Sequence, residues 1–267
     1  MSHSVITSFN NPQIKNLNLL QKKARARKDQ GLFVVEGIKM FEEAREAGIL
    51  VKAYISESFY QEKLDKQDFF IGLDYEIVAD SVIKQVADTM TPQGIMGTVR
   101  MPIYRLDQMI SKNKGFLILL EDIRDPGNMG TIIRTAEAAG VTGIILNRSC
   151  ADIFQPKVVR STMGSIYRLP YYEVDNYIEF LPRLKSHGYT LYAAHLSGQS
   201  YDCQDGHLDK CGLLIGNEAK GLSDEASNYA DKLVRIPMAG KVESLNAAIA
   251  AAILMYELAR QMKIDID

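Results

Sequence analysis

"LLIGNEAKGLS", Leu213 to Ser223, places an apolar run directly before a glycine and a short polar turn. The run is typical of a strand buried on both faces, which belongs to a parallel sheet. Glycines at 216 and 221 predict a sharp turn where backbone amides could meet a ligand closely. The alternative is a plain strand-to-helix turn, in which Asn217 satisfies backbone groups and Ser223 caps the next helix.

Four further apolar runs share this pattern and alternate with helix-compatible sequence. They are FLILLED, GIILNR, TLYAAH and LVRIPM, all after residue 114. Buried strands joined by helices predict a parallel α/β sheet with helices on both faces. Ligands of such sheets bind at the carboxyl ends of the strands. The candidate site therefore lies where three runs end, in LLEDIRDPGN, LLIGNEAKG and VRIPMAGKVESLN.

The first hundred residues predict a separate, small α/β unit. They alternate the strand-like runs LFVVEG, VKAYIS, YEIVAD and GIMGTV with helical stretches at 38–47 and 81–87. The segment from Val99 to Gly115 contains a proline and mixed polar residues, which is typical of a linker. We place the boundary near residue 105, which gives domains 1–105 and 106–267.

Composition and missing motifs exclude several classes of protein. A chain of 267 residues with 46% hydrophobic residues can bury a sizeable core. Its longest apolar run, Ala247 to Tyr256, is shorter than the roughly 18 residues of a membrane helix, and no secretion signal is evident, so we expect a cytoplasmic protein. No two glycines stand two apart, which excludes GxGxxG, and GxxxxGK[ST], GxSxG and HExxH are also absent. The cysteine and histidine spacings indicate no metal site.

Positive charge is concentrated near the N-terminus. The net charge is −2, yet residues 1–30 hold six Lys or Arg and one acid. Five of the basic residues lie within seven positions: Lys22, Lys23, Arg25, Arg27 and Lys28. One face presenting them would make several phosphate contacts with a nucleic acid. A solvated helix without a ligand is the alternative.

The stretch DIRDPGNMGTIIRTAEAAG predicts a helix of about ten residues. Asp125 and Asn128 are N-cap residue types, and Gly140 is typical of the position after a helix end. Arg134 points away from the apolar stripe, so it either meets a ligand or is a surface residue paired with Glu137. The stripe consists of Ile132, Ile133, Ala136 and Ala139.

The last apolar stretch predicts an alanine-rich helix. It would begin at Glu243 or Ser244 and end near Arg260 and Lys263, whose charges suit the helix dipole. The many alanines allow another backbone to approach closely, within the fold or across a subunit interface. The expected buried stripe is Leu245, Ile249, Ile253 and Tyr256.

Taken together and in order, three segments resemble the motifs of the SpoU/TrmH family of RNA ribose 2'-O-methyltransferases, in the SPOUT superfamily. They are NMGTIIR, GNEAKGLS and IPMAGKVESLNAAIA, and the resemblance covers about residues 115–262. Ala219 departs from the pattern, which often has glycine there. The resemblance implies a parallel-sheet domain whose C-terminal part forms a deep trefoil knot. It also implies a preceding α/β substrate-recognition domain similar to ribosomal protein L30e.

The resemblance further implies a cofactor, S-adenosylmethionine, held among the loops largely by backbone groups. The matching positions are Gly216, Asn217, Ile236, Met238 and Leu245, with Ala194, His195 and Leu196 as the remaining wall. The catalytic positions carried over are Asn128, Arg134, Glu218, Ser244 and Asn246. RNA would contact the five basic side chains near the N-terminus, and the family favours a homodimer.

The implied chemistry is in-line attack of a ribose 2'-oxygen on the sulfonium methyl. It needs no metal because the leaving thioether is neutral, and alignment of the reactants can contribute about 7 to 11 kcal/mol. The family assigns proton removal to Arg134, but a guanidinium is effectively never deprotonated in proteins. We therefore expect a cationic Arg134 that stabilises the developing alkoxide and binds a phosphate, while the hydroxyl proton is transferred to phosphate or water.

Two other functions fit parts of this sequence. An RNA-binding protein of the same fold without catalysis is one, although the intact catalytic positions argue against it. An enzyme that methylates a small molecule or a protein is the other, and its basic segment would have no affinity for RNA. The motifs are compatible with both ribosomal and transfer RNA as the substrate.

Overall fold

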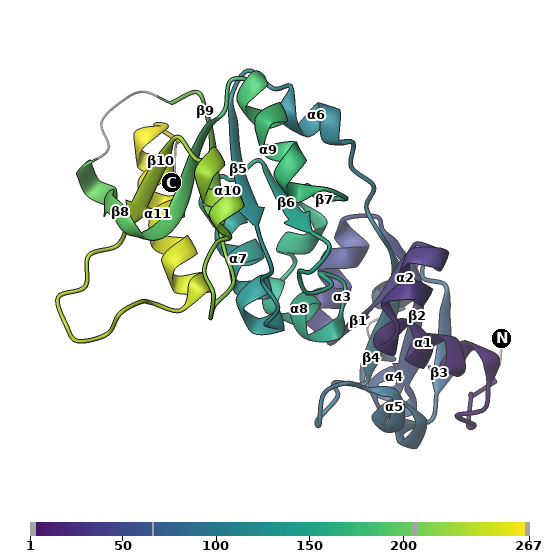
Figure 1. The fold of residues 1–267 in the computed structure, drawn as a ribbon. Helices are drawn as coiled ribbons and strands as arrows, with labels where there is room; N and C mark the ends of the chain where they lie inside the picture. The colour runs from purple at the N-terminus through teal and green to yellow at the C-terminus, as the bar shows by residue number, and fades with distance from the viewer. Residues whose placement is uncertain (1–3, 66, 204–207, 265–267) are drawn as a thin grey trace. The chain divides into compact units, whose positions relative to one another are not determined.

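The chain divides into two compact units in the computed structural model, which describes residues 4–65, 67–203 and 208–264 (Figure 1). The first unit comprises Met1–Pro102 and Asp152–Tyr167, and the second comprises Ile103–Ala151 and Arg168–Asp267. Residues 152–167, which a single boundary near residue 105 leaves in the second domain, thus pack within the first unit. In the described part of the chain, no helix combines the length and apolar character needed to cross a membrane.

The first unit is built on a four-stranded sheet in the order β1-β4-β2-β3. Strand β4 pairs antiparallel with β1 and β2, whereas β2 and β3 are parallel. The strands are β1 Leu32–Glu36, β2 Leu50–Ser56, β3 Tyr75–Val78 and β4 Ile95–Arg100. The α-helices are α1 Pro12–Lys22, α2 Ala24–Gln30, α3 Ile38–Glu46, α4 Glu57–Lys63 and α5 Asp80–Val86, with a 3-10 turn η1 at Gln67–Phe70. All four predicted strands are present, so the small α/β unit is confirmed.

Residues 152–167 contribute helix α8, Pro156–Thr162, and the 3-10 turn η2, Ser165–Tyr167, to the first unit. The Phe154 ring lies 4.7 Å from the Phe33 ring of β1. The Tyr167 hydroxyl donates to the backbone carbonyl of Met40 in α3 at 3.2 Å. Aromatic packing and a buried hydrogen bond therefore attach this segment to β1 and α3.

The second unit is built on a six-stranded sheet in the order β10-β8-β9-β5-β6-β7, and every neighbouring pair is parallel. The strands are β5 Gly115–Leu120, β6 Gly143–Asn147, β7 Tyr171–Val174, β8 Thr190–Ser200, β9 Lys210–Ile215 and β10 Lys232–Arg235. The predicted parallel sheet is confirmed. Strand β7 was not predicted, because its sequence YYEV is a half-exposed edge strand rather than an apolar run. The knot stays a prediction.

Helices lie on both faces of this sheet (Figure 1). Helices α6, α9 and α10 share a buried cluster with Leu117 and Leu119 of β5 and Leu214 of β9. The other face of the sheet meets the end of α11, because Cys211 Sγ of β9 lies 3.3 Å from Met262 Sδ, and α7 packs against α11. The helices are α6 Leu106–Ile110, α7 Pro126–Ala138, α9 Tyr177–Ser186, α10 Asp224–Tyr229 and α11 Ala247–Gln261, with a 3-10 turn η3 at Tyr201–Cys203.

Helix α11 begins later than predicted and buries a different stripe. The Asn246 side chain caps it by accepting from the backbone N–H groups of Ala248 and Ile249. The predicted stripe was wrong: Ile249 and Tyr256 are 50% and 44% exposed. Alanines make up half of the buried side, where their small size allows the helix to approach its neighbours closely. The buried residues are Ala247, Ala248, Ala251, Leu254, Met255, Leu258, Ala259 and Gln261.

Candidate functional site

A cavity of about 330 Å³ opens beside the ends of β9 and β10 and the second half of β8. Four segments form its walls: 194–196, 215–222, 234–238 and 243–254. All eight residues predicted to bind the cofactor line this cavity: Ala194, His195, Leu196, Gly216, Asn217, Ile236, Met238 and Leu245. Segments far apart in sequence therefore meet at one place, as expected for the carboxyl edge of a parallel sheet.

The lining combines apolar side chains with loop backbone. Sequence reasoning missed several members, although most lie within the motif segments: Ile215, Leu222, Val234, Ala247, Ala250 and Leu254 as apolar wall, and Lys220 and Glu243 as charged rim. An adenosine with a methionyl tail requires an apolar slot bordered by backbone N–H and C=O groups. The walls provide both, so the residues present fit S-adenosylmethionine. No group of three potential metal ligands occurs within the described ranges.

The loop after β9 is held by its own hydrogen bonds. Asn217 Oδ1 accepts from the backbone N–H groups of Ala219 and Lys220 at 2.9 and 3.2 Å. Backbone N–H and C=O of Asn217 and Gly221 bond to each other at 3.0 and 2.9 Å. A Cβ at Gly216 would lie 2.2 Å from the Leu222 nitrogen, so the turn itself requires glycine there. The tight turn and the cavity wall, which the sequence offered as alternatives, are both present.

Three catalytic candidates from three different motifs form a chain of hydrogen bonds. Asn128 Nδ2 donates to Glu218 Oε1 at 2.7 Å, and Asn246 Nδ2 donates to Asn128 Oδ1 at 2.9 Å. Asp125 caps α7 by accepting from the Asn128 backbone N–H at 2.8 Å, while Asn246 caps α11. The two helix starts thus fix both asparagines beside Glu218, which lines the cavity together with Ser244.

Arg134 lies apart from this cluster. It is exposed on α7, about 9 Å along the helix axis from Asn128, and it does not line the cavity. Among the residues that the structure describes, the guanidinium of Arg134 has no hydrogen-bond or ion-pair partner. The predicted alternative of a pair with Glu137 is not formed; Glu137 instead accepts from Arg168 Nη2 at 3.2 Å. The guanidinium of Arg134 is free to meet a ligand.

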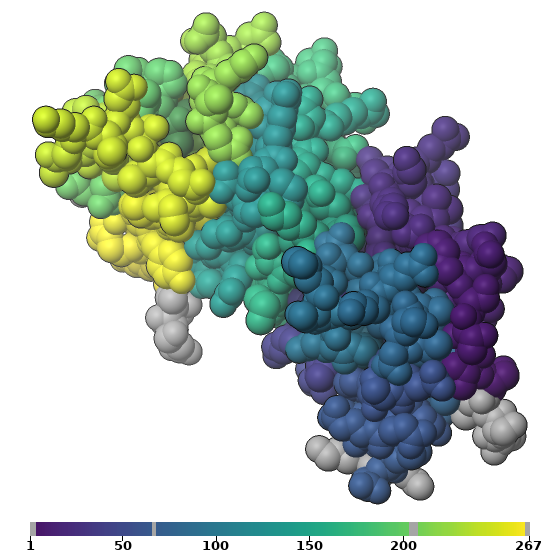
Figure 2. Space-filling view, turned by 90° about the horizontal axis from the view of Figure 1, so that it is seen from below, coloured from purple at the N-terminus to yellow at the C-terminus, as the bar shows by residue number. Residues whose placement is uncertain are grey.

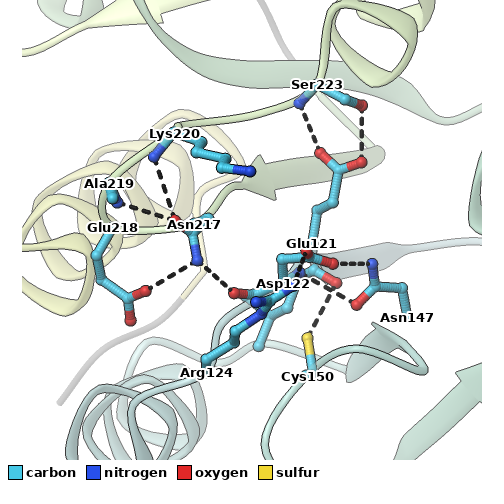
Figure 3. A network of polar contacts seen from close by, with 11 residues as sticks. Glu121, Asp122, Arg124, Asn147, Cys150, Asn217, Glu218, Ala219, Lys220 and Ser223 are labelled. Carbon is cyan, nitrogen blue, oxygen red and sulfur yellow. Dashed lines mark hydrogen bonds and ion pairs between the residues drawn. The ribbon is translucent and has the colours of Figure 1, made fainter.

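Residues just after β5 and at the end of β6 hold the loop after β9 in place (Figure 3). Glu121 accepts from the backbone N–H and the hydroxyl of Ser223 at 2.8 and 2.7 Å. Asp122 and Asn147 bond to each other, and the Asp122 carbonyl accepts from Asn217 Nδ2 at 2.9 Å. Burial raises the pKa of the nearby Cys150 thiol to about 11, so it stays protonated near neutral pH. The polar ends of LLED and IILN were the available signal for these residues.

The basic segment is only partly available to a nucleic acid. Helix α1 ends at Lys22, Lys23 is extended, and α2 follows, so the segment is not one continuous helix. Arg27 is 3% exposed and was wrongly grouped with the phosphate contacts. Its guanidinium is occupied by Asp152 Oδ2 at 2.5 Å and by the carbonyls of Leu20 and Gln21. The other members are exposed: Lys22, Lys23, Arg25 and Lys28.

Parts of both units match known protein families, and most of the chain matches known proteins. Residues 115–256 match the SpoU rRNA Methylase family, and residues 11–97 match the MRM3-like substrate binding domain. The chain is 30% identical to the 23S rRNA (guanosine(2553)-2'-O)-methyltransferase RlmP of Bacillus subtilis, over 95% of this chain and 98% of that protein. It is 32% identical to the 23S rRNA (uridine(2479)-2'-O)-methyltransferase of Streptomyces viridochromogenes, over 90% and 85%. An AdoMet-bound rRNA methyltransferase from Sinorhizobium meliloti superposes with a TM-score of 0.83 at 32% identity, covering 98% of this chain and 99% of that chain.

Proposed function

The chain belongs to the SpoU rRNA methylase family and is an S-adenosylmethionine-dependent RNA 2'-O-ribose methyltransferase, and we propose that its cavity and the adjoining Asn128–Glu218–Asn246 chain are where the transfer occurs. The meeting of three separate motifs beside one cavity carries this proposal. The methyl donor supplies an electrophilic methyl group, and the residues of this chain hold and orient what reacts with it.

The cavity is proposed to seat the donor through backbone groups and apolar side chains. Loop residues Gly216 and Asn217 and the segment from Ile236 to Met238 would border it, with Leu245 and the 194–196 segment opposite. Because the loop is already fixed by internal hydrogen bonds, little order has to be gained when the donor binds. Preorganisation of this kind favours binding in a geometry ready for in-line attack.

The polar chain is proposed to position the ribose. Glu218 and Asn128 present a carboxylate oxygen and amide groups next to the cavity, where a sugar hydroxyl would lie, and Ser244 adds a hydroxyl. Arg134 would bring a positive charge that stabilises the 2'-oxygen as it loses its proton and that contacts the neighbouring phosphate. The proton would leave to that phosphate or to water.

Completion of the site by a second copy of the chain is proposed because Arg134 does not reach the cavity of its own chain. The C-terminal segment, yellow in Figure 2, lies at the surface beside the teal segment that contains α7. Helix α11 leaves Ile249 and Tyr256 exposed, and an unpartnered apolar stripe of this kind fits a homodimer interface. Sedimentation of the wild type and of Ile249→Asp tests this: we expect a dimer and a monomer, and a monomeric wild type would contradict it.

Ribosomal RNA is the proposed substrate, reached in the cytoplasm. Two relatives that align along most of the chain are named as 23S rRNA methyltransferases, and the first unit matches a substrate-binding domain. Lys22, Lys23, Arg25 and Lys28 would contact phosphates, and the attacked 2'-hydroxyl itself distinguishes RNA from DNA.

Methyl transfer from labelled S-adenosylmethionine to purified ribosomal RNA, transfer RNA and DNA tests the function. We expect label in ribosomal RNA at ribose 2'-oxygens, and none in DNA. Binding of RNA without transfer would instead indicate an inert RNA-binding protein of the same fold. Mapping of ribose methylation in cells with and without the protein then identifies the nucleotide.

A further inference from the structure

Asp122, the second residue after the end of β5, has an unusual backbone conformation. Its φ is +58°, and among described non-glycine residues only Met163 and Lys263 also have a positive φ. This left-handed region is unfavourable for residues with a Cβ, although aspartate tolerates it better than most. Some interaction must therefore hold Asp122 in place.

Asn147, at the end of the neighbouring strand β6, supplies that interaction. Its Oδ1 accepts from the Asp122 backbone N–H at 3.1 Å, and its Nδ2 donates to Asp122 Oδ1 at 2.7 Å. The side-chain amide of Asn147 thus bonds to both the backbone and the side chain of Asp122. Arg124 also pairs with Asp122 Oδ2 at 2.9 Å, but this arginine is two-thirds exposed and such surface pairs contribute little.

The conformation of Asp122 determines where its carbonyl points. That carbonyl accepts from Asn217 Nδ2 at 2.9 Å, and the Oδ1 of the same Asn217 side chain holds the N–H groups of Ala219 and Lys220. The loop fixed in this way forms one wall of the cavity and carries Glu218. A path of hydrogen bonds therefore runs from Asn147 through Asp122 to Asn217 (Figure 3), and Asn217 lines the cavity.

We propose that Asn147 and Asp122 are positioning residues of the methyl-donor site: Asn147 holds Asp122 in its left-handed conformation, and the Asp122 carbonyl then sets the Asn217 loop. The role as part of a donor site rests on the proposed function, whereas the effect on the loop does not. Neither residue touches the cavity, so each acts through Asn217.

The test is a rescue experiment on the full-length protein. In Asn147→Ala the left-handed conformation loses its support, and we expect affinity for S-adenosylmethionine to fall about tenfold, as calorimetry would measure. Adding Asp122→Gly should restore affinity to within about twofold of the wild type, because glycine adopts positive φ without help and keeps the carbonyl. Asn176→Ala, which removes the side-chain cap of α9 in the same unit, is the matched control and should leave affinity unchanged.

A merely structural role for Asn147 would give a different pattern, since the double variant lacks the Asn147 bonds just as the single variant does. Failure of Asp122→Gly to restore affinity, or an Asn147→Ala variant with wild-type affinity, would overturn the proposal. Should Asn147→Ala be insoluble, Asp122→Gly and Asp122→Ala give the same comparison, with the alanine variant expected to bind about tenfold more weakly.

Hydrogen exchange at the Ala219 and Lys220 amides separates this proposal from the proposed function. Exchange should accelerate about tenfold in Asn147→Ala and return in the double variant, whether or not the donor binds. A wild type that binds no S-adenosylmethionine would refute the function, while the exchange pattern would still decide whether Asn147 holds the loop. Unchanged exchange in Asn147→Ala would refute the positioning role alone.

Discussion

Helices α2 and α7 each carry an arginine that the sequence assigns to RNA, and the structure uses the two in opposite ways. Arg27 of α2 is 3% exposed, and its guanidinium bonds to Asp152 and to the carbonyls of Leu20 and Gln21. Arg134 of α7 is exposed, with no such partner in the described part of the chain. One guanidinium is bound within the fold by four hydrogen bonds, and the other is available.

The surroundings of a charge, rather than the density of charge in the sequence, therefore decide its role. Arg27 lies in the most basic stretch of the chain, whereas Arg134 lies in an ordinary amphipathic helix. The partner of Arg27 is 125 residues away, in a segment that packs within the first unit. Local sequence contains no sign of such a partner. Four sets of substitutions test this contrast.

Arg27→Ala should have the largest effect, and the effect should be on stability. Removing one partner of a buried ion pair typically costs about 3 to 5 kcal/mol, because the remaining groups lose their hydrogen bonds. Asp152 is about a quarter exposed, so we expect the lower end of this range. The urea midpoint of the first unit should fall, with Arg25→Ala as a control from the same helix. A stable Arg27→Ala variant with weakened RNA binding would contradict this and indicate that Arg27 contacts phosphates.

Arg134→Ala should instead remove nearly all activity and leave the fold intact. Loss of one group that stabilises developing negative charge costs on the order of 10²- to 10³-fold in kcat. Melting temperature and donor affinity should stay unchanged, because the side chain is exposed and lies outside the cavity. Single-turnover methyl transfer gives the rate. Arg134→Lys should be partly active, and equal inactivity of both variants would argue against a purely electrostatic role.

Neutralising the exposed basic side chains together should weaken RNA binding without affecting the donor. The four are Lys22, Lys23, Arg25 and Lys28, each changed to Gln. Every cation removed from a phosphate should reduce the slope of log affinity against log salt by about 0.7 for single-stranded RNA, or roughly 3 in total. Filter binding between low and physiological salt measures the slope, and calorimetry should give an unchanged donor affinity. An unchanged slope would identify the segment as a solvated surface.

The sequence was sufficient wherever local pattern and topology act together. The apolar runs predicted the parallel sheet, and Asp125 predicted the start of α7, because capping and strand burial depend on neighbouring residues. The same topology brings strand ends together, which explains why the motif residues gathered at one cavity.

What the sequence could not provide depends on distant partners. The prediction of the buried face of α11 was wrong, because close packing favours alanines over Ile249 and Tyr256. The burial of Arg27 depends on Asp152, and the support of the loop depends on a left-handed Asp122 held by Asn147. Each of these is a tertiary contact between segments whose own residues show no distinctive spacing.

Substitutions of Arg25 and of its helical neighbour Asp29 should have the smallest effect, because both side chains are exposed on α2. Arg25 Nε lies 3.6 Å from Asp29 Oδ2 and both side chains are largely exposed, so removing either should change the free energy of unfolding by less than about 0.5 kcal/mol. Their effects on RNA should have opposite signs. Arg25→Ala removes a cation and should weaken binding slightly, whereas Asp29→Ala removes a competing anion and should strengthen it. Salt-dependent binding of the two variants measures this, and equal shifts in one direction would show that RNA does not approach this helix face.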